Sequence, residues 1–228
     1  MMHGFESFFL SGDIGRRRDY SAIALLGRRW ELPQGAAINW DNAISRLYVL
    51  MLMRFPLETD YKVIEDRLAD IWDYPELKPT SNYMILDMTG IGDPIVLDMR
   101  RRRVHTKGVI ITSGANVTHP EEDEWHVPKS VLATNLMNLV QTGKLKVLNE
   151  VADAKELAVQ LEGFKYKINR DTGNVTYEAE TEKIHDDLVI AVALAAWYAV
   201  SVVPKRTAVP RKGDIPAKYD PFARSING

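Results

Sequence analysis

The longest apolar segment of the sequence lies near its C-terminal end. It comprises 16 residues, Leu188–Val203, and its only interruption is a serine. This is shorter than the roughly 20 apolar residues that a helix needs to cross a bilayer. Asp186 and Asp187 precede the segment, and Lys205 and Arg206 follow it, so that each charge lies at the helix end whose dipole it complements. We therefore expect a buried helix over residues 186–202.

Short apolar runs that end at turn residues predict a series of strands upstream of this helix. The expected strands are Phe8–Gly12, Tyr20–Leu26, Arg46–Phe55, Tyr83–Leu86 and Val109–Thr112, followed by a hairpin of Phe164–Ile168 and Val175–Glu178. The expected helices are Asp60–Trp72, Asp93–Arg102, Pro128–Thr142 and Ala154–Glu162. Short turns should make the first three strands antiparallel, and helical connections should make the later ones parallel. The sequence thus predicts an α/β fold with a mixed sheet and helices on both faces.

Composition excludes several classes of function. The chain has 228 residues and no cysteine, so thiol catalysis, zinc–thiolate sites and iron–sulfur clusters are ruled out. The net charge of −2 does not by itself indicate nucleic-acid binding, which would have to depend on local basic patches. We expect one domain over residues 1–203 and an extended, basic, proline-containing tail over residues 204–228.

Acidic residues stand at the ends of apolar elements. Asp13 ends the first strand, Asp87 ends the fourth, and Asp186 and Asp187 open the last helix. A carboxylate in such a place is costly unless it is solvated, paired or bound to a cation. If the first and fourth strands are neighbours and the last helix packs over them, the four carboxylates converge. An all-oxygen cluster of this kind suits Mg²⁺ or Mn²⁺, and two such ions can promote phosphodiester cleavage.

Two acidic residues in a row cannot point the same way on a helix, because neighbouring positions diverge by about 100°. Either Asp186 or Asp187 can therefore bind metal while the other caps the helix or binds a second ion, and we favour Asp186. A second group of histidines and acids lies between Thr118 and Pro128. Its polar surroundings favour a solvated loop over a metal site.

Three segments carry a resemblance to a known family. Ser11-Gly12-Asp13-Ile14-Gly15 and the following Asp19–Ile23 resemble the first strand and hairpin of the nuclease domain of phage terminase large subunits. Leu86–Gly92 is similar to the central acidic motif of that family, and His185–Ala195 is similar to its C-terminal acidic motif. The three segments occur in the family's order, and the resemblance covers about residues 8–200.

The resemblance implies a ribonuclease H-like fold and an endonuclease that cuts concatemeric viral double-stranded DNA during genome packaging. It implies that Asp13, Asp87 and one or both of Asp186 and Asp187 hold two divalent ions, Mg²⁺ or Mn²⁺. It also implies a terminase ATPase domain or subunit, a small terminase subunit and a portal as partners, in the host cytoplasm. The chain departs from a full large subunit because it lacks the Gly-x-x-x-x-Gly-Lys-Ser/Thr loop, so we expect no ATP site.

DNA contact requires basic side chains near these carboxylates. Contacts of this kind would go to phosphates, independently of sequence and sensitive to salt. The hairpin at residues 164–178 resembles an insertion that lies near the DNA path in this family. The candidate residues are Arg16, Arg17 and Arg18 after Asp13, the run Arg100, Arg101, Arg102 and Arg103, and Lys165, Lys167 and Arg170 on the hairpin.

Two alternatives to a packaging nuclease remain open. A Holliday-junction resolvase or an integrase-like enzyme would share the fold and the metal chemistry but would act on branched DNA or join strands. A DNA-docking module that needs a separate ATPase motor would bind DNA and barely cut it in isolation. A panel of linear and branched substrates distinguishes the first alternative, and cleavage by the isolated chain distinguishes the second.

Overall fold

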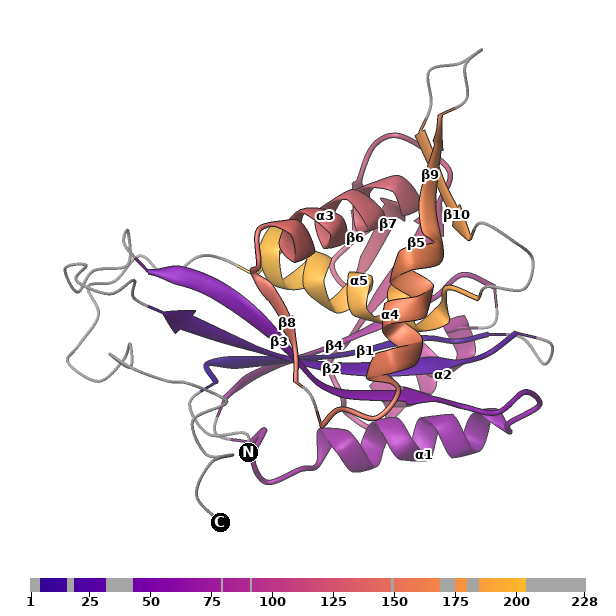
Figure 1. Cartoon of the computed structure of the whole chain (residues 1–228). Helices are drawn as coiled ribbons and strands as arrows, with labels where there is room; N and C mark the ends of the chain where they lie inside the picture. Colours follow the sequence, from indigo (N-terminus) through magenta and orange to yellow (C-terminus); the bar gives the residue numbers. More distant parts are fainter. Residues whose placement is uncertain are drawn as a thin grey trace.

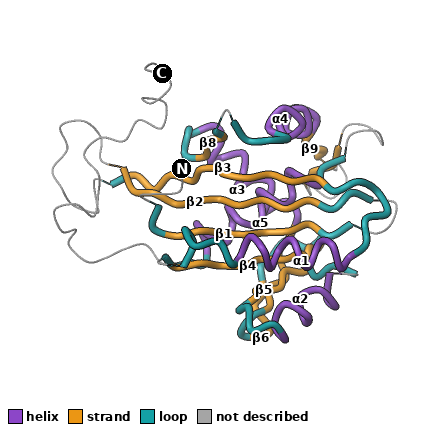
Figure 2. Tube along the Cα trace, turned by 90° about the horizontal axis from the view of Figure 1, so that it is seen from below, coloured by secondary structure: helices purple, strands orange, loops and turns teal. Residues whose placement is uncertain are grey.

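The computed structural model describes residues 5–15, 19–31, 43–78, 80–90, 92–148, 150–168, 175–179 and 185–203. A central sheet runs through this part in the order β6-β7-β5-β4-β1-β2-β3-β8 (Figures 1 and 2). Its strands are β1 (Ser7–Asp13), β2 (Ala22–Glu31), β3 (Ile44–Arg54), β4 (Ser81–Asp87), β5 (Thr106–Thr112), β6 (Thr118–Glu121), β7 (Glu124–Pro128) and β8 (Leu145–Val147). The helices are α1 (Tyr61–Trp72), α2 (Gly92–Arg101), α3 (Lys129–Gln141), α4 (Ala154–Gly163) and α5 (Asp187–Ser201).

The strand directions confirm the predicted mixed sheet. β1, β2 and β3 pair antiparallel. β4 then lies parallel to β1 on its other side, β5 is parallel to β4, and β7 is parallel to β5. The separate hairpin of β9 (Phe164–Ile168) and β10 (Val175–Ala179) also has the expected position, while its turn lies outside the described residues.

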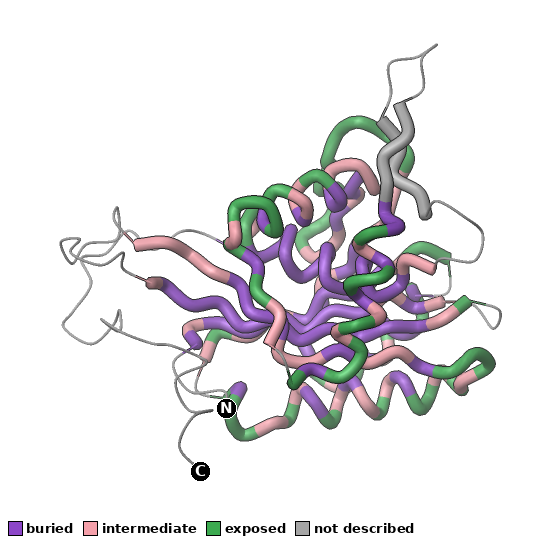
Figure 3. The backbone as a smooth tube through the Cα atoms, in the orientation of Figure 1, coloured by how far each residue is buried: buried purple, intermediate pink, exposed green. Residues whose placement is uncertain are grey.

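Helices cover both faces of the sheet. α3, α4 and α5 share a buried apolar cluster on one face, and α1 and α2 share another on the opposite face (Figures 1 and 3). Successive side chains along a strand point to opposite faces. Phe8 and Leu10 of β1 therefore belong to the α1 side, while Phe9 lies in the α5 cluster. The same alternation decides on which face the acidic residues at the strand ends lie.

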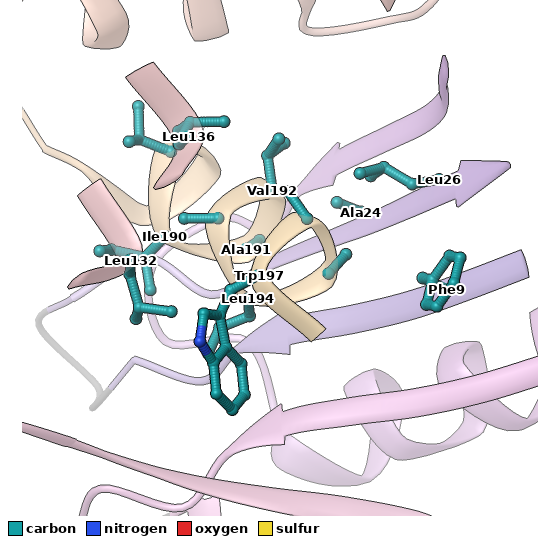
Figure 4. Close-up of a cluster of buried hydrophobic side chains, with 14 of the residues drawn as sticks. Phe9, Ala24, Leu26, Leu132, Leu136, Ile190, Ala191, Val192, Leu194 and Trp197 are labelled. Atoms are coloured by element: carbon teal, nitrogen blue, oxygen red, sulfur yellow. The ribbon is translucent and has the colours of Figure 1, made fainter. Parts of the chain in front are cut away.

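Helix α5 is the predicted buried helix. It is buried over residues 187–199 because β1 and β2 pack on one side of it and α3 on another. Figure 4 shows its side chains between Leu132 and Leu136 of α3 and Ala24 and Leu26 of β2. A helix that is apolar all round must be enclosed in this way. Within the described residues, no helix has the length and apolarity needed to span a membrane.

Residues 118–128 form strands β6 and β7, so the expectation of a solvated loop was wrong. Alternation explains β7, because Trp125 and Val127 are buried while His126 between them is partly exposed. β6 lies at the edge of the sheet and is fully exposed, so its composition resembles that of a loop. The short strand β8, parallel to β3, was also not expected. The predicted tail over residues 204–228 lies outside the described residues.

Candidate active site

Asp13 and Asp87 end neighbouring parallel strands. Gly12 of β1 is paired with Leu86 of β4, so the next residue on each strand is one of the two aspartates. Asp13 follows Phe9 and Ser11 at intervals of two, and Asp87 follows Ile85 at the same interval, which directs both toward the face that α5 covers. The first and fourth strands are therefore neighbours, as the expected convergence of the carboxylates requires.

Helix α5 brings the other two acids to the same place. The Ser11 hydroxyl donates a hydrogen bond of 2.7 Å to the carbonyl oxygen of Ala191, which is one helical turn after Asp187. This contact holds the start of α5 next to the end of β1. Asp186 is the N-cap residue, although its side chain makes no capping hydrogen bond, and Asp187 is the first helical residue.

The four carboxylates line one open pocket of about 400 Å³. Its lining comprises Asp13, Ile14, Gly15, Asp19, Tyr20, Asp87, Thr89, Gly90, His185, Asp186 and Asp187. Gly15 and Gly90 belong to the turns that leave β1 and β4. The Tyr20 and His185 rings meet edge to face, with their centroids 4.8 Å apart. His185 is partly exposed, as expected for a histidine just before the helix.

The pocket destabilises negative charge. Burial and the charges of Asp87, Asp186 and Asp187 raise the pKa of Asp13 well above its ordinary value, and Lys129 opposes this rise only in part. Burial also raises the pKa of Asp87, against the effect of its hydrogen bonds with Thr89. The backbone N–H of Thr89 donates to Asp87 Oδ1 at 2.7 Å and fixes that carboxylate.

Two basic residues that the sequence did not single out neutralise the acids on α5. Lys129, the first residue of α3, places Nζ 2.6 Å from Asp186 Oδ2. Arg54, the last residue of β3, donates from Nε to Asp187 Oδ2 and from Nη2 to Asp187 Oδ1, both at 2.9 Å. Neither residue belongs to a local motif, so only the arrangement of the folded elements could have shown that the two residues lie beside these acids. Their positive charges replace part of the positive charge that a bound cation would supply to these carboxylates.

The donor chemistry of the pocket fits hard divalent cations. Its acidic ligands are carboxylate oxygens, which Mg²⁺ and Mn²⁺ prefer. In the described part of the chain, no three acidic or histidine side chains already stand close enough together to hold one ion. The ion pairs with Lys129 and Arg54 hold two of the carboxylates in this arrangement.

The predicted DNA-contacting residues are spread over different parts of the molecule. Gly92, the first residue of α2, approaches the carbonyl oxygen of Asp87, so the helix begins beside the pocket. Its ten residues extend about 15 Å, which places the arginine run at the far end of the helix. Arg100 donates to the carbonyl oxygens of Thr106 and Asp123, whereas Arg101 is exposed.

Within the same run, Arg102 forms ion pairs with Asp98, Asp66 and Glu65, while Arg103 is exposed. Arg16, Arg17, Arg18 and Arg170 lie outside the described residues, and for Lys165 and Lys167 only the backbone of β9 is described. Their contact with DNA stays a prediction.

The histidine and acid group near residues 118–128 makes other contacts. His119 stacks on Trp125 with ring centroids 4.3 Å apart. Asp123 accepts hydrogen bonds from His105 and Lys107. Trp125 in turn meets Tyr198 of α5 edge to face. These contacts join the edge of the sheet to its core.

Comparison with known proteins supports the fold. Neither the protein-family models nor the curated proteins contain a match to this sequence. Among solved structures, the chain is similar to the human cytomegalovirus terminase nuclease domain, in a structure described as soaked with Mn and bound to an inhibitor. The TM-score is 0.50 at 14% sequence identity, over 87% of this chain and 85% of the other. The chain therefore has the ribonuclease H-like fold of a terminase nuclease domain, as the resemblance implied.

Proposed function

We propose that this chain is a metal-dependent endonuclease that hydrolyses the phosphodiester bonds of double-stranded DNA. The observation that carries the proposal is the pocket in which Asp13, Asp87, Asp186 and Asp187 meet at the C-terminal ends of β1 and β4. The similar solved structure is a nuclease domain and was soaked with Mn, which agrees with a site of this chemistry. In packaging, the partners would be a terminase ATPase, a small subunit and a portal.

The carboxylates would have distinct roles. Asp13 is coupled electrostatically to the other three, so it suits a position shared by two ions. Asp87, fixed by the Thr89 N–H, would hold one ion, and an acid of α5 would hold the other. The ions that these carboxylates would hold would supply the positive charge needed to activate an attacking water and to stabilise the leaving oxygen. The raised pKa values of Asp13 and Asp87 mean that proton loss and ion binding are coupled, because a cation favours the charged form.

Cleavage of supercoiled plasmid by the purified full chain tests this proposal. The assay compares Mn²⁺, Mg²⁺ and EDTA, beside Asp13→Asn and Asp87→Ala. The matched control is Asp70→Ala, because Asp70 is exposed on α1 on the other side of the sheet. We expect nicking and linearisation with metal, none with EDTA, and none from either pocket variant, while the control cuts like the natural sequence.

The same assay separates the alternatives. Folded protein that binds DNA and cuts in neither metal would contradict the nuclease proposal for the isolated chain and favour a docking module that depends on a motor. Preferential cutting of four-way junctions over linear duplex would favour a resolvase. Metal-dependent cutting that survives in Asp13→Asn would exclude the assigned roles of the carboxylates.

A further inference from the structure

The two acids that begin α5 have different surroundings. Asp187 is 5% exposed, and both of its oxygens accept hydrogen bonds from Arg54. Oδ1 also accepts from Gln160 Nε2 at 3.1 Å. An arginine is always charged and binds a carboxylate as a planar fork. A metal ion at Asp187 would therefore have to approach oxygens that already face a fixed positive charge.

Gln160 links this ion pair to the backbone of α5. Its side chain is 1% exposed, and its amide oxygen accepts from the backbone N–H of Leu188 at 3.0 Å and of Val189 at 3.3 Å. These are N–H groups in the first turn of α5, which have no partner within the helix. The Asp186 side chain makes no capping bond, so Gln160 of α4 performs the capping that the local sequence lacks.

Arg54 has further contacts that keep it in place. Its guanidinium lies 3.7 Å from the centre of the Tyr20 ring, and Nη1 donates to Glu156 Oε1 at 3.0 Å. Tyr20 meets His185 edge to face, so the same residue supports the segment just before the helix. The start of α5 is therefore held from β3, from α4 and from the turn after β1.

Asp186 is held much more loosely. Its side chain is 27% exposed, and one oxygen contacts the ammonium group of Lys129, which is itself 35% exposed. Lysine is a point charge on a flexible chain and is displaced more easily than a bidentate arginine. The carboxylate of Asp186 thus remains available to a cation that enters the pocket.

We infer that Asp187 is a positioning residue which, with Arg54 and Gln160, fixes the first turn of α5, and that Asp186 is the carboxylate through which α5 binds metal. The inference rests on the proposed function, since it names which acid completes that site. Of the two adjacent aspartates, Asp187 thus has a structural role and Asp186 is the metal ligand.

Mn²⁺ binding to the full chain, measured by calorimetry, tests the assignment alongside plasmid cleavage. We expect Asp186→Asn to weaken Mn²⁺ binding at least about 30-fold and to abolish cleavage. We expect Asp187→Asn to leave the Mn²⁺ dissociation constant within about threefold of the natural value and to slow cleavage about 10-fold, because Asp186 is less well placed. Glu162→Gln serves as the control, because it removes an exposed charge from α4 and should change neither Mn²⁺ binding nor cleavage.

A second variant covers the event that Asp187→Asn does not fold. Arg54→Gln combined with Asp187→Asn removes both charges and keeps hydrogen-bonding groups, so no buried charge is left alone. This double variant should bind Mn²⁺ like the natural sequence. Weakening of Mn²⁺ binding in it, or in Asp187→Asn, by as much as in Asp186→Asn would overturn the inference. If the natural sequence binds no Mn²⁺ and does not cut DNA, the proposed function itself fails, which is a different result.

Discussion

The Ser11 hydroxyl donates to the carbonyl oxygen of Ala191, 180 residues further along the chain, and so joins strand β1 to helix α5. Both residues are buried, and each lies within four positions of an acid in the pocket. Ser11 is two residues before Asp13, and Ala191 is four residues after Asp187. This hydrogen bond is therefore one of the contacts that fix the distance between the strand acid and the helix acids.

Replacing Ser11 with alanine should lower stability and disturb the pocket. A buried hydrogen bond of this kind contributes about 1 kcal/mol to the free energy of unfolding. We expect Ser11→Ala to lose about that amount in urea denaturation. Ser113→Ala, at an exposed position, should stay within about 0.5 kcal/mol of the natural sequence. Equal losses in the two variants would contradict the role of Ser11.

Asp13 should make the metal-free protein less stable as pH rises. Its pKa is raised in the folded state, so the folded protein binds the proton more tightly than the unfolded chain. This contribution to the stability of the folded protein is complete below a pH of about 4, which is the ordinary pKa of the carboxyl in the unfolded chain. It is lost as pH rises through the pKa that the carboxyl has in the folded protein. In EDTA at pH 7, we expect Asp13→Asn to be more stable than the natural sequence, and each kcal/mol gained would raise the melting temperature by ~2–4 °C.

Denaturation of both proteins between pH 4 and pH 8 checks this expectation. The natural sequence should lose stability relative to Asp13→Asn across that range, and Asp70→Asn should follow the natural sequence. A variant that is less stable than the natural protein at pH 7, and equal to it at pH 4, would contradict the predicted sign.

Lys129 should compete with metal for Asp186. We expect Lys129→Met to strengthen Mn²⁺ binding by about 3–10-fold, because a paired, partly exposed charge of this kind is worth roughly 1 kcal/mol. Calorimetry on the metal-free protein measures the change. Lys144→Met, at an exposed position, is the control. Weaker binding after removal of Lys129 would show that the lysine supports the site and does not compete with the ion.

Gly92 should be irreplaceable at the start of α2. A Cβ at this position would lie 1.7 Å from the carbonyl oxygen of Asp87, and a backbone atom cannot easily move aside. We expect Gly92→Ala to cost about 3 kcal/mol or more and to reduce cleavage, since Asp87 must shift. Gly114→Ala is the matched control, because a Cβ there would be 3.6 Å from its nearest neighbour. Similar thermal melting of the two variants would contradict this expectation.

Much of the fold could be predicted because its signals are local. The apolar run after Asp187 indicated a buried helix, and the strand ending at Asp13 was bounded by turn residues. The edge strand β6 gave no such signal, since all its residues are exposed and only pairing with β7 makes it a strand. Three-residue β8 is equally dependent on its neighbour β3.

The site was predictable to the extent that its residues end recognisable elements. Asp13 and Asp87 stood out because a charge follows an apolar strand. Arg54 and Gln160 did not, because an arginine at a strand end and a glutamine on a helix are ordinary until the chain brings them to Asp187. The run from Arg100 to Arg103 shows the opposite case, in which a dense local charge is partly used for internal contacts.

The placement of α5 at the centre of the molecule has a consequence for biosynthesis. When the first 180 residues have been synthesised, Asp13 and Asp87 are present in the growing chain, but the helix that packs over them is not. The emerging chain then exposes the apolar face of β1 and β2 and cannot complete the acidic pocket. Pairing residues so distant in sequence is also a slow step in folding. The acidic pocket, and with it the proposed cleavage activity, would therefore be complete only after translation has passed the last helix.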